Sequence, residues 1–423
     1  MKTDRDRALD DLSVAAQIDW QPRRDAGLNR LRSFTPSMAH AYERERNYDR
    51  GPRLRSNVSL LSPWLRHRLI LETEVLDSAL QIWSLDEAEK FVEEVFWRGY
   101  FKGWLEHYPQ VWKNYRRDLD DAIESLGAEV ELARRFESAT SGETGIDCFD
   151  VWVRELTEIG YLHNHARMWF ASIWIFTLKL PWQLGADFFY RHLLDGDPAS
   201  NTLSWRWVAG LHTKGKTYLA RSSNIAKYSE ARFSDVQELA RDAQPLTEPD
   251  YGPAQALDSV ASNTPTGEFG LLVTHEDCTP ETLSLPRPPV AACGIGRLEN
   301  HVQLPIDWRV REFSKSAVDD ALRRIEHEFG ISTAEIDDAD WCNQIIDWAH
   351  ALGIKEIVTA YAPVGPTQEA LKTATHYLER HELKLTAIKR GYDNVVWPFA
   401  SKGYFAIKKQ IPAIIESLQL PSN

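Results

Sequence analysis

The sequence has 423 residues, of which 43% are hydrophobic and 26% charged, and its formal net charge is −13. This length suits two domains, and this composition is typical of a globular protein. The negative charge excludes indiscriminate binding to nucleic acid, which needs an extended basic surface, but it leaves room for one local basic groove. Tryptophan is the unusual residue, with 16 copies, twelve of them before residue 250. We interpret them as a large helical core or as a pocket for a flat aromatic ligand.

The cysteines and the apolar segments indicate a cytoplasmic protein. Four widely spaced cysteines, without any C-x-x-C pair, predict neither a zinc site nor a disulfide framework: Cys148, Cys278, Cys293 and Cys342. The first residues, MKTDRDRALDD, lack the apolar core of a signal peptide. The most apolar run, residues 168–178, is too short to cross a bilayer. We therefore predict no membrane association and no bound metal.

Residues 1–241 have helical periodicity and almost no strand pattern. Ser84 and Glu87 form a capping-box pattern ahead of apolar residues at helical spacing, such as Phe91 and Val95. A second helix is predicted from about residue 149 to Gly160, and a third from about residue 163 to a point before Pro181. This part is predicted to be an all-α domain.

Residues 242–268 are rich in Pro, Gly, Asp and Ser and are predicted to be an interdomain linker. Residues 269–423 then alternate between strand and helix patterns, which predicts an α/β domain with a parallel sheet. Its predicted strands are 269–275, 289–293, 356–361 and 383–388. Its predicted helices are 318–330, 341–353 and 366–380. The pattern does not determine the order of the strands.

The sequence contains none of the common catalytic motifs, so we consider individual residues as candidates for a functional site. His163 and His165 resemble a metal-binding pair, but two residues apart on a helix they point in different directions. Asp195 and Asp197 lack the glycine that a calcium loop requires at its sixth position. Arg167 can be interpreted in two ways. It forms an ion pair with this DGD loop that only closes a helix–loop junction, or it lines a pocket that has tryptophans as flat walls.

Several collinear motifs favour the pocket. The run HNHARM, followed by a Trp-rich helix and by DGDPASNTLSWRW at 195–207, resembles the flavin-binding domain of the DNA photolyase and cryptochrome family. YERERN at 42–47, VSLLSPWL at 58–65, EEVFWRGYF at 93–101 and KTYLARSSNIAKYSEARF at 216–233 resemble further motifs of that family. The similarity covers residues 40–235 in order. It implies that residues 1–241 are a helical FAD-binding domain.

The resemblance implies a cofactor and the residues that hold it. FAD would be bound by Tyr42, Ser59, Leu61, Ser62, Arg98, Arg167, Asp195, Asp197 and Asn201. Arg167 would pair with Asp195 beside the flavin ring, and Asn201 would face the reactive ring nitrogen. Trp205 and Trp182 match the first two tryptophans of the chain that reduces the flavin in light. No residues could be matched to a second, antenna chromophore.

The resemblance also implies a pocket for a pyrimidine dimer flipped out of DNA. Glu94 would hydrogen-bond or protonate the dimer, while Trp97 and Trp207 would stack on it. Asn164 and Met168 complete the set of substrate-binding residues.

Three features depart from the family pattern. The third tryptophan of the chain has no counterpart, so Trp152 or Trp174 are alternative electron exits. His165 replaces an arginine and Gly99 a glutamate, and we expect both changes to weaken polar contacts on the DNA side. The α/β domain follows the helical domain instead of preceding it. We interpret this order as a circular permutation of a Rossmann-like, antenna-type domain, the alternative being an unrelated domain.

Two functions remain open at this point. The first is a blue-light-dependent photolyase that repairs cyclobutane pyrimidine dimers in UV-damaged DNA. The alternative is a cryptochrome-like photoreceptor that binds FAD without repair and signals through a protein partner. Repair requires a basic rim around the flavin cavity, for which the candidates are Arg44, Arg46, Arg55, Arg206 and Lys214.

Overall fold

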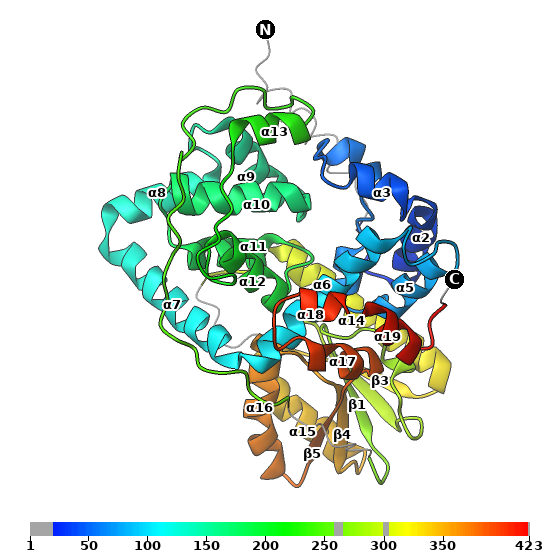
Figure 1. Cartoon of the computed structure of the whole chain (residues 1–423). Helices are drawn as coiled ribbons and strands as arrows, with labels where there is room; N and C mark the ends of the chain where they lie inside the picture. The colour runs from blue at the N-terminus through cyan, green and yellow to red at the C-terminus, as the bar shows by residue number, and fades with distance from the viewer. Residues whose placement is uncertain (1–19, 258–264, 299–303, 422–423) are drawn as a thin grey trace.

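The computed structural model describes residues 20–257, 265–298 and 304–421. The first half consists of helices and short turns around a large apolar core (Figure 1). Its α-helices are α2 (Arg24–Phe34), α3 (His40–Glu45), α4 (Ser62–Arg66), α5 (Glu72–Leu80), α6 (Glu89–His107), α7 (Pro109–Ala128), α8 (Val130–Ser141), α9 (Asp147–Ile159), α10 (Asn164–Ser172), α11 (Trp182–His192), α12 (Pro198–Val208) and α13 (Ser222–Tyr228). The all-helical character predicted for this half is confirmed.

Local signals explain where these helices begin and end. Ser84 and Glu87 exchange the predicted hydrogen bonds, with Ser84 N–H donating to Glu87 Oε2 at 3.0 Å, but they close a turn, and α6 begins only at Glu89. Helix α9 ends at Gly160, whose φ of 74° lies in the left-handed region that glycine adopts without strain. Helix α10 continues into a π-helical turn, η3 (Ile173–Thr177), and the chain leaves it before Pro181 as predicted.

The second half contains one five-stranded sheet among the described residues. Its strands are β1 (Gly270–Thr274), β2 (Ala291–Ile295), β3 (Ser332–Ile336), β4 (Glu356–Ala360) and β5 (Lys384–Ile388). They lie in the order β3-β2-β1-β4-β5, and every pair is parallel. This confirms the predicted parallel sheet and gives the order that the sequence left open, which is that of one doubly wound α/β sheet.

Two details of this half differ from the sequence prediction. Strand β3 was not predicted, because four of its five side chains are not fully buried and so carry little apolar signal. The connection from β1 to β2 contains only a short 3₁₀ turn, η4 (Pro280–Thr282), and no α-helix. The remaining helices are α14 (Trp308–Phe329), α15 (Trp341–Ala351) and α16 (Pro366–Glu379), followed by the C-terminal α17 (Gly391–Val396), α18 (Phe405–Lys408) and α19 (Ile411–Ser417).

The three central strands, β1, β2 and β4, are buried on both faces of the sheet, and the two faces belong to different cores. Leu271 and Val273 of β1 pack into the large core that also contains the helical half and α14. Leu272, between them, points to a smaller core beneath α15 and α16. This alternation follows from the two-residue repeat of a strand. The two halves therefore share one continuous apolar core.

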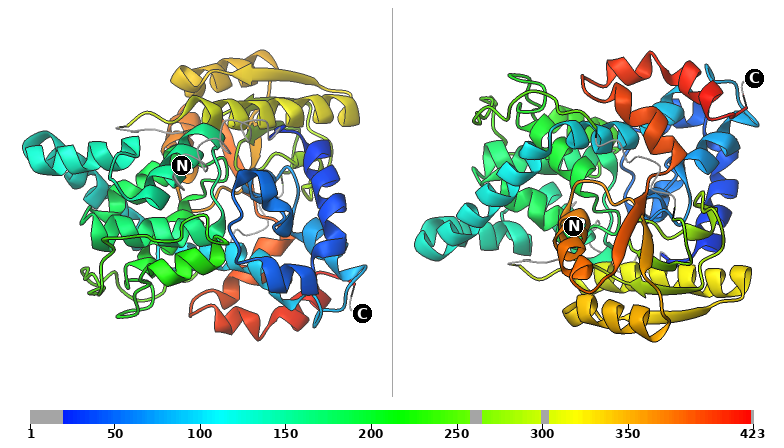
Figure 2. Two further views of the ribbon diagram at one scale, coloured as in Figure 1. Left: turned by 90° about the horizontal axis from the view of Figure 1, so that it is seen from above. Right: turned by 90° about the horizontal axis from the view of Figure 1, so that it is seen from below.

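The C-terminal helices return to the first half (Figures 1 and 2). Helix α17 and the 3₁₀ turn η6 (Trp397–Phe399) pack against α6. Two glycines of α6 allow this close approach: a Cβ on Gly99 would lie 2.8 Å from Tyr392 Oη, and one on Gly103 would lie 2.8 Å from the Cβ of Ala400. The expectation that Gly99 weakens contacts on a DNA side is therefore wrong, because this residue is buried beneath the C-terminal segment.

Candidate functional site

A cavity of about 260 Å³ lies among α3, α6, α10 and the loop before α4. Ten of the residues predicted to bind cofactor or substrate line it: Tyr42, Ser59, Leu61, Ser62, Glu94, Arg98, Asn164, Arg167, Met168 and Asp195. They come from segments as far apart in the chain as Tyr42 and Asp195, so the fold brings together residues that are distant in sequence. Further lining residues include Arg46, Tyr161 and His165.

The loop at residues 58–62 is shaped by a strained residue. Leu60 has a φ of 58°, in the left-handed region that a branched side chain rarely adopts. Such a residue costs about 1–3 kcal/mol and is retained where the surrounding structure fixes it, commonly at functional sites. All five residues of this loop line the cavity.

Arg167 and Asp195 form the predicted pair. Arg167 Nη2 donates to Asp195 Oδ2 at 2.8 Å, and Arg167 Nε donates to the carbonyl oxygen of Leu162 at 2.9 Å. Tyr161 lies beneath the guanidinium, with its ring centroid 5.2 Å from Arg167 Cζ. The sequence did not identify Tyr161 as a site residue, because it belongs to none of the motifs. It is a single aromatic residue directly after Gly160, the glycine that ends α9.

Three buried polar atoms at this cavity have no hydrogen-bond partner among the described residues. They are Asp195 Oδ1, Arg98 Nε and Arg98 Nη2. Because leaving a buried polar group unpaired costs about 1–3 kcal/mol, such atoms indicate a place for a ligand. One accepts a hydrogen bond and two donate, which fits a ligand that combines a ring N–H with anionic oxygens. The residues present thus fit FAD, which has both groups.

Asp197 and Asn201 lie beside this cavity, outside the residues that line it. Asp197 caps α12 by accepting from Ser200 N–H at 2.8 Å, and Lys102 Nζ lies 3.5 Å from its Oδ2. Burial opposes its charge, but the nearby cations Lys102 and Arg98 lower the pKa of Asp197 below its usual range. Asn201 Nδ2 donates to the carbonyl oxygen of Ala186 at 2.7 Å.

Glu94 lies in the wall of the cavity and pairs with Arg46. Burial raises the pKa of Glu94, and the Arg46 guanidinium partly offsets this shift. Arg46 was expected on an exposed rim, but its charge is directed to Glu94. Sequence spacing gives no signal for this contact, because 48 residues separate the two partners.

Two other rim candidates are also internal. Arg55 is buried and pairs with Glu155, and Arg206 is buried with its Nη2 2.6 Å from Glu248 Oε1. Arg44 and Lys214 are exposed as a rim requires. The expected rim is therefore smaller than the sequence suggested.

His165 has an internal role that explains its place in the motif. Its ring stacks on Trp169 at a centroid distance of 4.2 Å, and its Nδ1 lies 2.9 Å from the carbonyl oxygen of Asn47. Trp169 in turn stacks on Trp152 at 5.5 Å. A row of three aromatic rings thus leads from the cavity into the core.

The remaining predicted tryptophans, Trp97, Trp182, Trp205 and Trp207, are not among the residues that line the cavity. Trp97 and Trp207 are partly exposed, and Trp207 stacks on Tyr218 at 5.7 Å. Trp205 is buried, with its ring centroid 6.1 Å from that of Trp174. Trp182 is buried and lies 5.4 Å from the ring of Tyr115.

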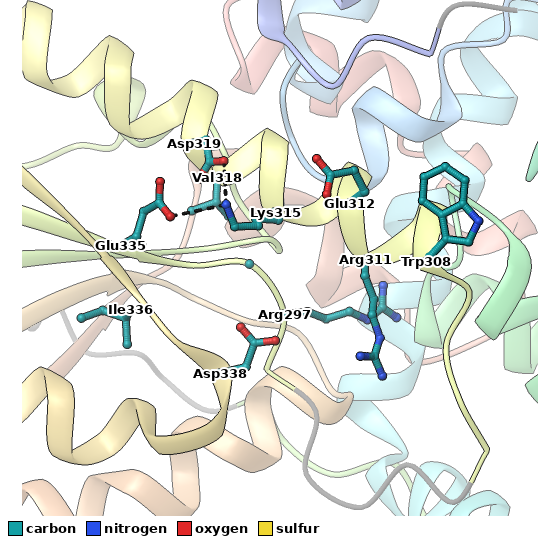
Figure 3. A pocket seen from close by; sticks show the side chains of 12 residues that line it. Arg297, Trp308, Arg311, Glu312, Lys315, Val318, Asp319, Glu335, Ile336 and Asp338 are labelled. Carbon is teal, nitrogen blue, oxygen red and sulfur yellow. Dashed lines mark hydrogen bonds and ion pairs between the residues drawn. The ribbon is translucent and has the colours of Figure 1, made fainter. Parts of the chain in front are cut away.

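A second cavity of about 240 Å³ lies in the α/β half, between α14 and the carboxyl ends of β2 and β3 (Figure 3). Lys315 crosses it and lies 3.4 Å from both Asp319 and Glu335. Arg297, Arg311 and Trp308 occupy its other end. It contains none of the residues predicted for cofactor or substrate.

Metal binding and membrane insertion have no visible basis in the described parts of the chain. Within residues 20–257, 265–298 and 304–421, no group of three or more His, Cys, Asp or Glu side chains is arranged to hold a metal ion. None of the helices described there combines the length and apolar character needed to cross a membrane.

Comparison with known proteins finds similarity in the helical half of the chain. Residues 91–237 match the family model of the FAD binding domain of DNA photolyase. The chain is 31% identical over 194 residues to a deoxyribodipyrimidine photo-lyase of Agrobacterium fabrum, covering 45% of this chain and 39% of that protein. It is 32% identical over 203 residues to a deoxyribodipyrimidine photo-lyase of Thermus thermophilus, covering 47% of this chain and 45% of that protein.

Among solved structures, a bacterial class III photolyase from Agrobacterium tumefaciens is 27% identical, with a TM-score of 0.42, and the match covers 54% of this chain and 46% of that one. The chain thus spans less than half the length of the relatives that it matches. In its helical half the chain is thus similar to the FAD-binding domain of the DNA photolyase family, over residues 91–237.

Proposed function

We propose that this protein is a blue-light-dependent photolyase that repairs cyclobutane pyrimidine dimers in DNA with FAD. The observation that carries the proposal is the composition of one cavity. Arg98 and Asp195 present buried polar atoms without hydrogen bonds there, and Glu94, Asn164 and Met168 line the same cavity. Residues suited to a flavin and residues suited to a flipped base thus face a common space.

On this proposal the flavin is held from two sides. Ser59, Leu61 and Ser62, with Tyr42 and Arg98, bind its phosphates. Arg167 holds Asp195 so that Asp195 Oδ1 accepts from the ring, while Asp197 and Asn201 support the ring from α12. Bound reduced FAD supplies the electron that opens the cyclobutane ring after excitation by blue light.

The lesion occupies the solvent side of the cavity. Glu94, whose pKa burial raises, donates or accepts a hydrogen bond at the edge of the dimer. Asn164 is exposed at the start of α10, and Met168 lies one turn further along the same helix. Trp97 and Trp207 supply flat surfaces next to this place.

We also propose that residues 269–423 are the antenna-type α/β domain of the family in permuted order, joined by residues 242–268 to the FAD-binding domain of residues 1–241. The doubly wound strand order β3-β2-β1-β4-β5 supports this. The test is a chain in which residues 269–423 precede residues 1–241. It should bind FAD like the natural chain, whereas a folded but flavin-free product would favour an unrelated domain.

The decisive test of repair uses the purified protein reduced with dithionite and UV-irradiated oligo(dT). We expect recovery of thymine absorbance under blue light, none in the dark, and none with the oxidised protein. Double-stranded substrate containing one dimer tests the strand preference. If both substrates stay unrepaired while FAD is bound, the photoreceptor function replaces the proposal, and the burial of Arg55 and Arg206 would then explain weak DNA binding.

A further inference from the structure

Trp97, one of the proposed lesion-binding residues, is covered on one face by a residue from the other end of the chain. The ring of Tyr404 stacks on the Trp97 indole at a centroid distance of 3.7 Å and an interplanar angle of 8°. Tyr404 lies immediately before α18, about 300 residues later in sequence, and it is 6% exposed. This is the tightest parallel aromatic stack among the described residues.

The backbone of α6 anchors the same tyrosine. Tyr404 Oη donates to the carbonyl oxygen of Glu93 at 2.9 Å, and Lys408, one turn later, lies 2.5 Å from Glu93 Oε1. Glu93 directly precedes Glu94, and Trp97 follows Glu94 by three residues on the same face of the helix. The C-terminal segment thus contacts the turn of α6 that contains Glu94 and Trp97, the two proposed lesion-binding residues of this helix.

The stack leaves Trp97 only one face for a ligand. Tyr404 occupies one side of the indole, and Trp97 is still partly exposed. Tyr100 meets the indole at 83°, an edge contact that further restricts its rotation. A pyrimidine ring that stacks on Trp97 must therefore approach opposite Tyr404, against an indole whose orientation is already fixed.

We propose that Tyr404 is a positioning residue for the lesion: it holds the Trp97 indole flat, so that the C-terminal segment forms part of the substrate site. This inference rests on the proposed repair function. The physical reason is preorganisation, because an indole that is already held loses less freedom when the dimer binds.

The experiment compares Tyr404→Ala and Tyr404→Phe in the full-length protein with FAD bound. We expect Tyr404→Ala to raise the Kd for dimer-containing oligo(dT), and the KM of repair, roughly three- to tenfold, the effect of one aromatic pair, with little change in kcat. Tyr404→Phe keeps the stack and should stay within about twofold of the wild type.

Tyr108→Ala is the matched control. Tyr108 lies 4.4 Å from Trp104, two turns further along α6, and its hydroxyl donates to the carbonyl oxygen of Ser401 at 2.9 Å. The variant therefore removes a similar ring at the end of the same helix, together with its hydrogen bond to the same C-terminal segment. It should lower stability about as much as Tyr404→Ala while leaving the Kd for the lesion unchanged.

A double-mutant cycle with Trp97→Ala separates positioning from general stability. We expect Tyr404→Ala to have no further effect on lesion binding once Trp97 is removed. Additive effects, or equal losses in Tyr108→Ala, would overturn the inference. Tighter binding by Tyr404→Ala would also overturn it, by showing that Tyr404 occupies the place of the lesion. If the wild type neither repairs nor binds the dimer, the proposed function fails instead.

Discussion

At the scale of single residues, the candidate site depends on polar groups that the protein itself leaves incomplete. Asp195 is hydrogen-bonded through one oxygen and not the other. The Nε and Nη2 atoms of Arg98 are buried without a hydrogen bond among the described residues, 4.0 and 3.7 Å from the carboxylates of Glu72 and Asp197. Glu94, by contrast, pairs with Arg46 and has no oxygen among the buried polar atoms that lack a hydrogen bond. This difference separates a cofactor group from a substrate group within one cavity.

Glu94→Ala should lower the repair rate about tenfold, the loss of one hydrogen bond worth about 1.4 kcal/mol, and leave the FAD content unchanged. We expect FAD to be retained because Glu94 is hydrogen-bonded to Arg46, and the residues proposed to hold the cofactor, Arg98, Arg167 and Asp195, are unchanged in this variant. Repair of irradiated oligo(dT) and the ratio of flavin to protein absorbance measure the two effects. Glu89→Gln, an exposed residue of the same helix, should change neither. Loss of FAD from Glu94→Ala would contradict the assignment of this helix face.

Where a residue belongs to a motif, the sequence could predict that it lines the site. The sequence could not predict which other side chains that residue contacts. Ten motif residues line one cavity as expected. The positions that depart from the motif have contacts that the motif did not indicate: Gly99 makes room for Tyr392, and His165 stacks on Trp169. Tyr392 is almost 300 residues from Gly99, so no local pattern could indicate it. Trp169 lies four residues after His165 on α10, and helical spacing alone could have indicated that contact.

At the scale of elements, helices with caps and buried strands were predictable, and exposed or unusual elements were not. Gly330 ends α14 and a side-chain oxygen of Asp307 caps its start, but the polar first turns hid ten residues of this helix. Strand β3 is held at the edge of the sheet by backbone pairing with β2 rather than by apolar side chains. Backbone pairing leaves no trace in composition.

The arrangement of α10, α11 and α12 leads to a prediction about electron entry. Trp205→Phe should reduce photoreduction of the bound flavin to a small fraction of the wild-type rate, while repair by chemically reduced protein is retained. Flavin absorbance under blue light with an external reductant measures the first effect. Trp83→Phe is the control, because Trp83 does not line the cavity and its Nε1 donates to the carbonyl oxygen of Thr35.

Unchanged photoreduction in Trp205→Phe would show that electrons enter by another route. The stacked rings of His165, Trp169 and Trp152 are then the path to test, since His165 lines the cavity and the centroid distances are 4.2 and 5.5 Å.

At the scale of the whole molecule, several buried histidines make stability depend on pH. Burial lowers the pKa of His163 and of His212 to about 4, and lowers the pKa values of His67 and His275 well below the usual range. In the unfolded chain each histidine binds a proton below about pH 6.5, while in the folded chain it stays neutral. The unfolded state therefore gains stability as the pH falls, by about 1.4 kcal/mol per pH unit for each histidine.

The free energy of unfolding should thus fall steadily from pH 6.5 towards pH 4.5, as urea denaturation at a series of pH values will measure. His212→Phe should make this profile shallower, by about 1.4 kcal/mol per pH unit. His376→Gln should not, because His376 is 82% exposed. Parallel profiles for the wild type and His212→Phe would contradict the neutral state of the buried ring.

The two halves of the molecule are also joined by a buried ion pair, and its arginine contacts the loop that contains Asp195 and Asp197. Arg66 Nη1 and Nη2 lie 2.7 and 2.8 Å from the carboxylate of Glu276, which follows β1, and both side chains are buried. Arg66 Nε donates to the carbonyl oxygen of Gly196, between Asp195 and Asp197, at 2.8 Å. The α/β half thus holds, through one arginine, the loop proposed to contact the cofactor.

Glu276→Gln should destabilise the protein by about 3–5 kcal/mol, because it leaves the Arg66 guanidinium buried without its counter-charge. FAD should also bind more weakly, since Arg66 no longer fixes the Gly196 carbonyl. Denaturation followed by circular dichroism and flavin fluorescence measures both effects. Glu335→Gln, which removes an exposed pair with Lys315, should cost no more than about 1 kcal/mol and leave FAD binding unchanged.

Because both halves share one apolar core, the circular dichroism and flavin fluorescence signals should change in a single unfolding transition. Two separate transitions would show that the halves fold independently and that the shared core contributes little to their association.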